Sequence, residues 1–388
     1  MSRARGFSLI ELMVAMAIMS IVVSGISFVL IQQSRASAKQ SQERDLEENG
    51  RLALLELAGA VRLAGYGINP LAAFDFDRYS CTAPGTGNTC NGGANYRDRT
   101  DGPDELVVSW RDPVFYRQVT SISGGGPWTV NFAGATTTLI NAGRIVQMLC
   151  TGAEPSAYLA VNGDVAIGST SMTLRALTNA DGYYIGYTGI GNTTNTTPTD
   201  ACFATSGLML VERVHYFVAN DTDGVPTLWK ERGRGANEKL FRGIEDLQFT
   251  YDIGQPPAGS AFVGTAAPAC AATVWTFGGP CATSPNQPLE TATAPDWRND
   301  NYDSANRYTG HPVNIHNVNI FVVARSSLGS ADNTLDTIPA YANRPGFTTA
   351  TGGIFHRTLF TITEQPENLL TRAHFLPPVF ANSNVGGG

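Results

Sequence analysis

Charged residues are scarce in this chain. Asp, Glu, Lys and Arg make up 15% of its 388 residues, against about 25% in an average globular domain. The hydrophobic share of 43% suffices for at least one large core, which excludes fibrous and highly charged disordered classes. The chain has 26 basic and 33 acidic residues, and its net charge of −7 argues against a nucleic-acid partner, which requires a basic patch.

Familiar catalytic motifs are also lacking. The sequence contains no GxSxG, no phosphate-binding GxxxxGK[ST] loop and no HExxH zinc motif. The run Asp221-Thr222-Asp223-Gly224 resembles the start of a calcium loop, but its twelfth position is Arg232 instead of a bidentate Glu, so we predict a hairpin turn there. The scattered histidines are interpreted as surface or hydrogen-bonded side chains. We therefore expect no catalytic residue, metal or cofactor.

A stretch almost free of charge lies near the N-terminus, where Glu11 is the only ionisable side chain between Arg5 and Arg35. Its apolar part, Phe7–Ile31, would form a helix about 37 Å long, enough to cross the ~30 Å hydrocarbon core of a membrane. Basic residues precede it, so we expect a cytoplasmic start and an exported remainder. A cleaved signal peptide is the alternative, because Ala36-Ser37-Ala38 offers a cleavage site, although signal cores usually span only about 7–15 residues.

Glu11 requires its own explanation. A carboxylate inside a membrane helix costs on the order of 3 kcal/mol and is functional by default. In the simplest interpretation Glu11 reaches the nearby interface and has no role. If Glu11 is buried instead, it needs a cation, and a cut after Gly6 would create one as a free α-amino group.

The run Gly6-Phe7-Ser8-Leu9-Ile10-Glu11 resembles the cleavage motif of type IV prepilins and type II secretion pseudopilins. The resemblance implies that a prepilin peptidase cuts after Gly6 and methylates the new amine of Phe7. It also implies that Glu11 pairs with an N-terminal amine when the subunit docks in a filament, so that both charges leave the lipid together. Many major pilins carry a proline within the apolar segment, and Phe7–Ile31 has none, so a kink is less expected here.

The helical pattern continues beyond the apolar segment. Apolar residues recur at spacings of 3, 4 or 7 on an otherwise polar stretch, and they are Leu46, Ala53, Leu57, Val61 and Ala64. Asn49-Gly50 interrupts this stripe, which costs about 1 kcal/mol relative to alanine. Gly65-Tyr66-Gly67 and the following Pro70 predict the end of the helix.

The rest of the chain is β-rich in pattern. We predict strands at Glu105–Trp110, Trp128–Phe132, Ile145–Cys150, Met209–Val218, Pro226–Lys230, Ile244–Tyr251, Val318–Ala324 and Ile354–Thr363. We therefore expect an α+β fold in which a long N-terminal pilin-type helix packs on a large antiparallel β-rich globular domain. The expected segments are a leader at 1–6, a membrane or filament-core helix at 7–31, its periplasmic continuation at 32–67 and one domain at 68–388.

Six cysteines lie in the exported part, at Cys81, Cys90, Cys150, Cys202, Cys270 and Cys281. An even number in an exported domain indicates disulfides, although six cysteines allow 15 connectivities. The first two and the last two each bracket a short loop, so we pair them locally and leave Cys150 for Cys202. Zinc is the rival interpretation, but no CxxC occurs and the spacings fit no usual finger.

Two further segments resemble PilW-type minor pilins: the helix end Val61–Gly67, and the block from Val211 to Phe249, which is also similar to GspJ-like pseudopilins. The resemblance implies a role in type IV pilus assembly, in the initiating or tip complex, as a single-pass inner-membrane protein with a periplasmic C-terminal domain. The implied partners are a prepilin peptidase, other minor pilins, the major pilin, the inner-membrane assembly platform and a tip adhesin. The alternatives are a type II secretion pseudopilin and a membrane-anchored glycan-binding or adhesive module.

Overall fold

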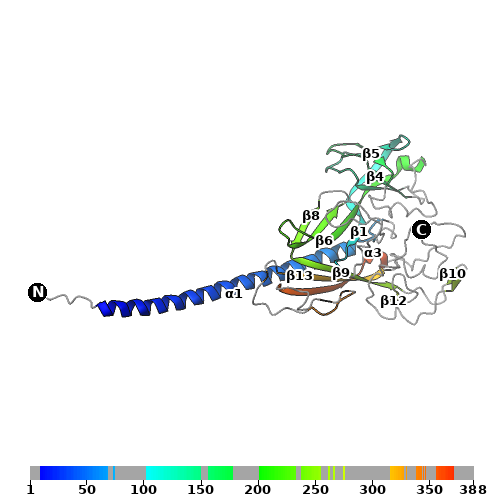
Figure 1. Cartoon of the computed structure of the whole chain (residues 1–388). Helices are drawn as coiled ribbons and strands as arrows, with labels where there is room; N and C mark the ends of the chain where they lie inside the picture. The colour runs from blue at the N-terminus through cyan, green and yellow to red at the C-terminus, as the bar shows by residue number, and fades with distance from the viewer. Residues whose placement is uncertain are drawn as a thin grey trace.

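The computed structural model describes residues 9–68, 73–74, 102–149, 156–177, 201–232, 237–254, 315–326 and 355–370. Shorter described pieces are 261–262, 265–266, 274–275, 329, 338–342, 344 and 346. Figure 1 shows a β-rich head from which one long helix projects toward the N-terminus. The predicted combination of a long helix and an antiparallel β-rich domain is confirmed.

The helix α1 (Leu9–Leu63) is continuous over 55 residues, which corresponds to about 80 Å. Its C-terminal part packs on the head, and the predicted apolar stripe is the face that is buried there: Leu46, Ala53, Leu57, Val61 and Ala64 are each at most 4% exposed. Turns follow at 64–67, where Gly65 and Gly67 have φ of +79° and +66°. Glycine adopts this left-handed region without strain, so the helix ends where the two glycines predict.

Gly50 does not break α1, contrary to the weakness that its low helix propensity suggests. A Cβ at this position would overlap the ring of Phe360, with ring atoms at 2.6 and 2.9 Å. Phe360 belongs to strand β14 (Arg357–Glu364), which lies against α1. Gly50 therefore lets the helix and the sheet approach closely, and packing there offsets its poor propensity.

Gly50→Ala is expected to destabilise the head by about 1 kcal/mol. The gain of about 1 kcal/mol in helix propensity is outweighed by about 1–3 kcal/mol of overpacking against Phe360. In a Phe360→Ala background the same change should become stabilising, because the ring is gone. Gly59→Ala is the matched control, since no atom lies within 4 Å of its added Cβ, and it should stabilise in both backgrounds. Urea unfolding of the four variants measures the effect, and equal Gly50→Ala values with and without Phe360 would contradict it.

A four-stranded antiparallel sheet covers one side of α1. Its order is β12-β9-β13-β14, formed by β12 (Val274–Trp275), β9 (Ile244–Gly254), β13 (Ile315–Arg325) and β14. In β9, Leu247, Phe249 and Tyr251 are buried against the helix, as their alternation with polar residues predicts. A two-stranded ribbon, β10 (Ala261–Phe262) and β11 (Thr265–Ala266), is separate from this sheet.

A second sheet contains eight strands in the order β1-β2-β5-β4-β3-β6-β7-β8. The strands are β1 (Leu106–Ser123), β2 (Trp128–Phe132), β3 (Ile145–Leu149), β4 (Ser156–Val161), β5 (Ser171–Arg175), β6 (Gly207–Asn220), β7 (Pro226–Arg232) and β8 (Glu238–Arg242). Because β1 also pairs with β6, the first six strands in this order close into a ring. All pairings are antiparallel, and a short 3₁₀ helix η3 (Ala201–Thr205) precedes β6.

The strand β1 extends beyond its predicted end at Trp110. Arg111 pairs with Val211 of β6, and pairing resumes at Tyr116 with Met209, so four residues of β1 bulge opposite one of β6. This bulge contains Pro113, which cannot donate to the ladder, and the Asp112 carboxylate accepts a hydrogen bond from the Val114 N–H at 2.8 Å. Residues 112–115 are thus a bulge within a strand that continues.

Candidate functional site: the exposed apolar helix

The N-terminal half of α1 carries an apolar surface that nothing in the described structure covers. Leu9 is 77% exposed and Ile21 is 72% exposed, whereas a core helix would bury such side chains. By length and composition this part of α1 can cross a membrane. Ile, Val, Leu and Met dominate it. The β-branched Ile and Val are weaker helix formers than Leu and Met, so apolar character is a stronger feature of this segment than helix propensity. This apolar surface is suited to contact with lipid or with other helices.

Few polar side chains interrupt this surface. Glu11 lies in the first turn of α1, where the positive end of the helix dipole favours a carboxylate. The Ser20 hydroxyl donates to the Ala17 carbonyl at 2.8 Å, which satisfies it within its own helix. The predicted cleavage-site residues Gly6 and Phe7 lie outside the described residues. The pairing of Glu11 with the Phe7 amine therefore stays a prediction.

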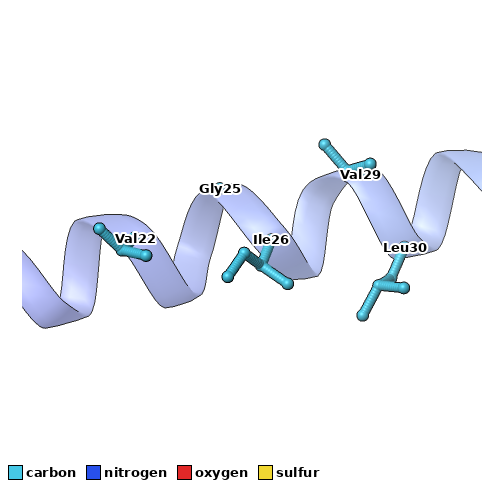
Figure 2. Close-up of a pocket in the computed structure, with 5 residues that line it drawn as sticks. All are labelled: Val22, Gly25, Ile26, Val29 and Leu30. Carbon is cyan, nitrogen blue, oxygen red and sulfur yellow. The ribbon is translucent and has the colours of Figure 1, made fainter.

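A shallow apolar groove lies on this half of α1. Figure 2 shows the side chains that line it, from Val22, Ile26, Val29 and Leu30, around Gly25. A Cβ added to Gly25 would meet no atom within 4 Å, so the surface here is open. Small residues of this kind let a neighbouring helix approach closely in an apolar environment.

Two polar groups of the head bind Glu56, which lies near the C-terminal end of α1. Its carboxylate accepts a hydrogen bond from the Tyr216 hydroxyl at 2.8 Å and pairs with the Lys230 ammonium. Burial favours a higher pKa for the Glu56 carboxyl, but the hydrogen bonds from Lys230 and Tyr216 outweigh it and hold the pKa below its ordinary value. Burial raises the pKa of Tyr216, and the Glu56 carboxylate raises it further. Tyr216 therefore stays protonated as a donor.

The end of α1 is attached to the head a second time. Arg62 forms a two-pronged pair with Glu364 of β14, with both N–O distances at 2.8 Å. Asn368, in the short helix α3 (Glu367–Leu370), donates to the carbonyls of Arg62 and Ala64 at 2.9 and 3.3 Å. These contacts satisfy carbonyls that the helix end leaves open.

The predicted hairpin turn is confirmed, since Asp221 and Asp223 lie between the antiparallel strands β6 and β7. Asp221 pairs with Lys239 at 2.6 Å, and Asp223 pairs with Arg242. His215 is buried between two carboxylates, with Nε2 2.8 Å from Glu105 and Nδ1 3.2 Å from Glu231. It is a hydrogen-bonded histidine, as predicted. Among the described residues no three His, Cys, Asp or Glu side chains are grouped to hold a metal.

Asp246 belongs to a buried polar cluster that the sequence pattern did not predict. This carboxylate, 1% exposed, accepts hydrogen bonds from the Tyr341 hydroxyl at 2.5 Å and from Arg344 Nε at 3.0 Å. Burial raises the pKa of the Asp246 carboxyl above its ordinary value, although Arg344, Tyr341 and Gln248 oppose this effect. Its neighbour Glu245 pairs with the arginines Arg325 and Arg357. No sequence signal links Asp246 to residues almost a hundred positions away.

The cysteine side chains lie outside the described part of the structure, although the backbone of Cys202 belongs to η3. Cys81, Cys90, Cys150, Cys270 and Cys281 are not among the described residues. The three predicted disulfides stay a prediction.

Two family models match the chain. The prokaryotic N-terminal methylation motif matches residues 1–27, and the type IV pilus-assembly protein W (PilW) model matches residues 215–368. Both describe pilin or pilus-assembly components, not enzymes. Searches of curated proteins and of solved structures returned no match. The exposed apolar helix begins within the methylation-motif match and is joined to a PilW-like β-rich head. This arrangement fits a single-pass inner-membrane anchor. The chain is therefore similar to type IV pilin-like proteins, with a methylation motif over residues 1–27 and a PilW-like region over residues 215–368.

Proposed function

We propose that this chain is a minor pilin that takes part in initiating a type IV pilus and stays at its tip. The observation that carries the proposal is the uncovered apolar half of α1, fixed to a large head at its other end. Such a helix is stable in the membrane before assembly and among other pilin helices afterwards. Its work is helix packing and protein–protein contact.

The helix contacts follow from the residues that interrupt the apolar surface. After cleavage following Gly6, the methylated amine of Phe7 would pair with Glu11, of this subunit or a neighbour, so that neither charge enters the apolar interior alone. The groove around Gly25 would receive a side chain from a neighbouring helix.

The size of the head supports the tip position. Residues 68–388 should have a radius of gyration of about 20 Å, against ~13 Å for a 100-residue head. Helices in a filament pack about 8–10 Å apart, so heads this large would compete for the same shell around the shaft. One copy at the end has room to spread sideways.

The partners follow from this position. A prepilin peptidase would process the chain, and the inner-membrane assembly platform would receive it. Other minor pilins and the major pilin would pack against α1, and a tip adhesin would contact the head. The head would lie in the periplasm before assembly. Pseudopilin function in type II secretion is the second candidate.

The mature chain is expected to begin at Phe7 with an N-methylated amine. Gly6 provides the small residue at the cut, and the basic residues Arg3 and Arg5 just before it do not favour entry into the membrane. Mass spectrometry of the N-terminal peptide from a pilus fraction checks this, with whole-cell precursor as the comparison. A terminus at Met1 or Lys39 would contradict the proposal.

Immunogold labelling against the head is expected to mark the ends of pili. Deletion of the chain should lower pilus number, because an initiating subunit is then missing, and re-expression should restore it. Antibody against the major pilin is the control for access along the shaft. Continuous labelling of the shaft by the head antibody would show that the crowding argument is wrong. Wild-type pilus number together with impaired protein secretion in the deletion strain would favour the pseudopilin.

A further inference from the structure

The closed ring of six strands is inserted within the pairing of β1 with β6, which has two parts separated by a bulge. Pairing between β1 and β6 begins at Leu106 with Tyr216 and runs to Arg111 with Val211, where the two strands line the helix core. Beyond the bulge the same strands pair again, at Tyr116 with Met209, as members of the ring. The strands β2, β5, β4 and β3 fill the space between them. The ring is thus built from the residues between Arg111 and Val211.

The ring has its own core. Side chains from all six strands pack inside it, among them Val119, Val130, Val146, Leu159 and Leu174. The core around α1 contains none of these residues and is formed by the helix with β1, β6, β7, β9 and β13. A closed antiparallel ring leaves no unpaired edge within itself, so its ladder does not depend on the other sheet.

Described contacts join the ring to the rest of the head near Arg111 and Val211: Ile145 of β3 pairs with Val211, and Arg111 Nη1 lies 3.3 Å from Met209 Sδ. Arg144, just before β3, pairs with Glu212 of β6. Ile68, which follows α1, packs with Ile145 and Tyr158 on the outside of the ring. The ring also lies between the two family matches, which cover residues 1–27 and 215–368. The pilin-like and PilW-like features therefore lie outside it.

We propose that residues 112–210 are an inserted β-barrel that folds as a separate unit and is not needed for pilus assembly. Assembly then depends on α1 and on the sheets that pack around it, and the barrel is an added module carried by the head. Its segment 118–143 contains no Asp, Glu, Lys, Arg or His. This part of the barrel offers a partner no charge to pair with.

Folding of the two units is tested with a matched pair of variants in the full-length chain in detergent. Leu159 in the barrel and Leu247 in the helix core are both 0% exposed, so Leu159→Asp and Leu247→Asp bury the same charge in different cores. Hydrogen exchange of β2–β5 peptides should rise at least tenfold in Leu159→Asp, while β9 and β13 peptides stay within twofold of wild type. A comparable rise in both regions would show one cooperative unit and overturn the proposal.

Assembly is tested by excision, and this arm rests on the proposed function. Arg111 and Val211 are cross-strand partners, so replacing residues 112–210 with Asn-Gly should close a hairpin. Ile68→Ser is included because excision uncovers this side chain. The excised chain should keep its β9 and β13 protection and restore pilus number in a deletion strain to within twofold of wild type. Loss of that protection, or a tenfold shortfall in pili with protection retained, would overturn the proposal. If the deletion strain itself makes a wild-type number of pili, the proposed function fails. The hydrogen-exchange experiment then still decides whether the barrel folds as a separate unit.

Discussion

Glu11→Ala should lower incorporation of the chain into pili about tenfold or more while leaving the melting temperature of the head unchanged. The expected loss arises because the Phe7 amine would enter an apolar environment without its counter-charge, and each 1.4 kcal/mol of lost pairing is tenfold in an equilibrium. The head is unaffected because the first buried residue of α1 is Leu46, far along the helix from Glu11. Quantitative immunoblotting of sheared pili against whole cells measures incorporation.

Ser20→Ala is the matched control for Glu11→Ala. Ser20 is also a polar residue on the exposed half of α1, but its hydroxyl already bonds to the Ala17 carbonyl of its own helix. Its removal should leave incorporation within about twofold of wild type. Normal incorporation of Glu11→Ala, or equal losses for both variants, would count against a paired charge.

Arg344→Leu is expected to destabilise the head by about 3 kcal/mol near pH 7. The change removes the cation bound to Asp246 and leaves a buried carboxylate without it, and breaking a buried pair in this way typically costs about 3–5 kcal/mol. Asp246→Asn in the same chain should recover most of the loss, because the remaining side chain is neutral. Urea unfolding of the full chain in detergent measures the free energy of unfolding of the wild type, the two single variants and the double variant.

The loss should shrink as the pH falls. Burial already raises the pKa of the Asp246 carboxyl, and removal of Arg344 raises it further. An acid whose folded pKa is above its unfolded pKa binds its proton more tightly in the folded state, so stability is gained as the pH falls through the folded pKa. The Arg344→Leu penalty should therefore be smaller at about pH 5 than near pH 7. The Asp246→Asn double variant lacks this carboxyl and should show no such recovery. A penalty independent of pH would contradict the assignment.

The local parts of the fold could be predicted from the sequence. The period of Leu46, Ala53, Leu57 and Val61 marked the buried face of α1, because a helix brings residues three and four apart onto one face. Alternation likewise located β9. The short strand β8 was missed, because its charged residues Glu238, Lys239 and Arg242 show no apolar alternation and it lies at a sheet edge.

Long-range pairing could not be predicted in the same way. Nothing in the pattern around Trp110 shows that β1 continues past Pro113 and meets β6 twice, because that depends on a partner about a hundred residues later. The same holds for the buried partners of Asp246. It also holds for Gly50, which is a poor helix former but leaves room for the Phe360 ring because it has no side chain. At the candidate site the motif identified Glu11 and the apolar surface, which are properties of consecutive residues.

Closure of the six-stranded ring also bears on aggregation. Proteins concentrated on a membrane or at a growing filament meet one another often, and exposed strand edges then join molecule to molecule. In the ring, β2, β3, β4 and β5 each have a neighbour on both sides. The free edge of the large sheet is β8, where Lys239 and Arg242 are paired with acidic residues of the neighbouring hairpin turn. Charged side chains of this kind discourage edge-to-edge joining. The ring and the β8 edge of the large sheet therefore offer little for strand-to-strand joining, even at high local concentration.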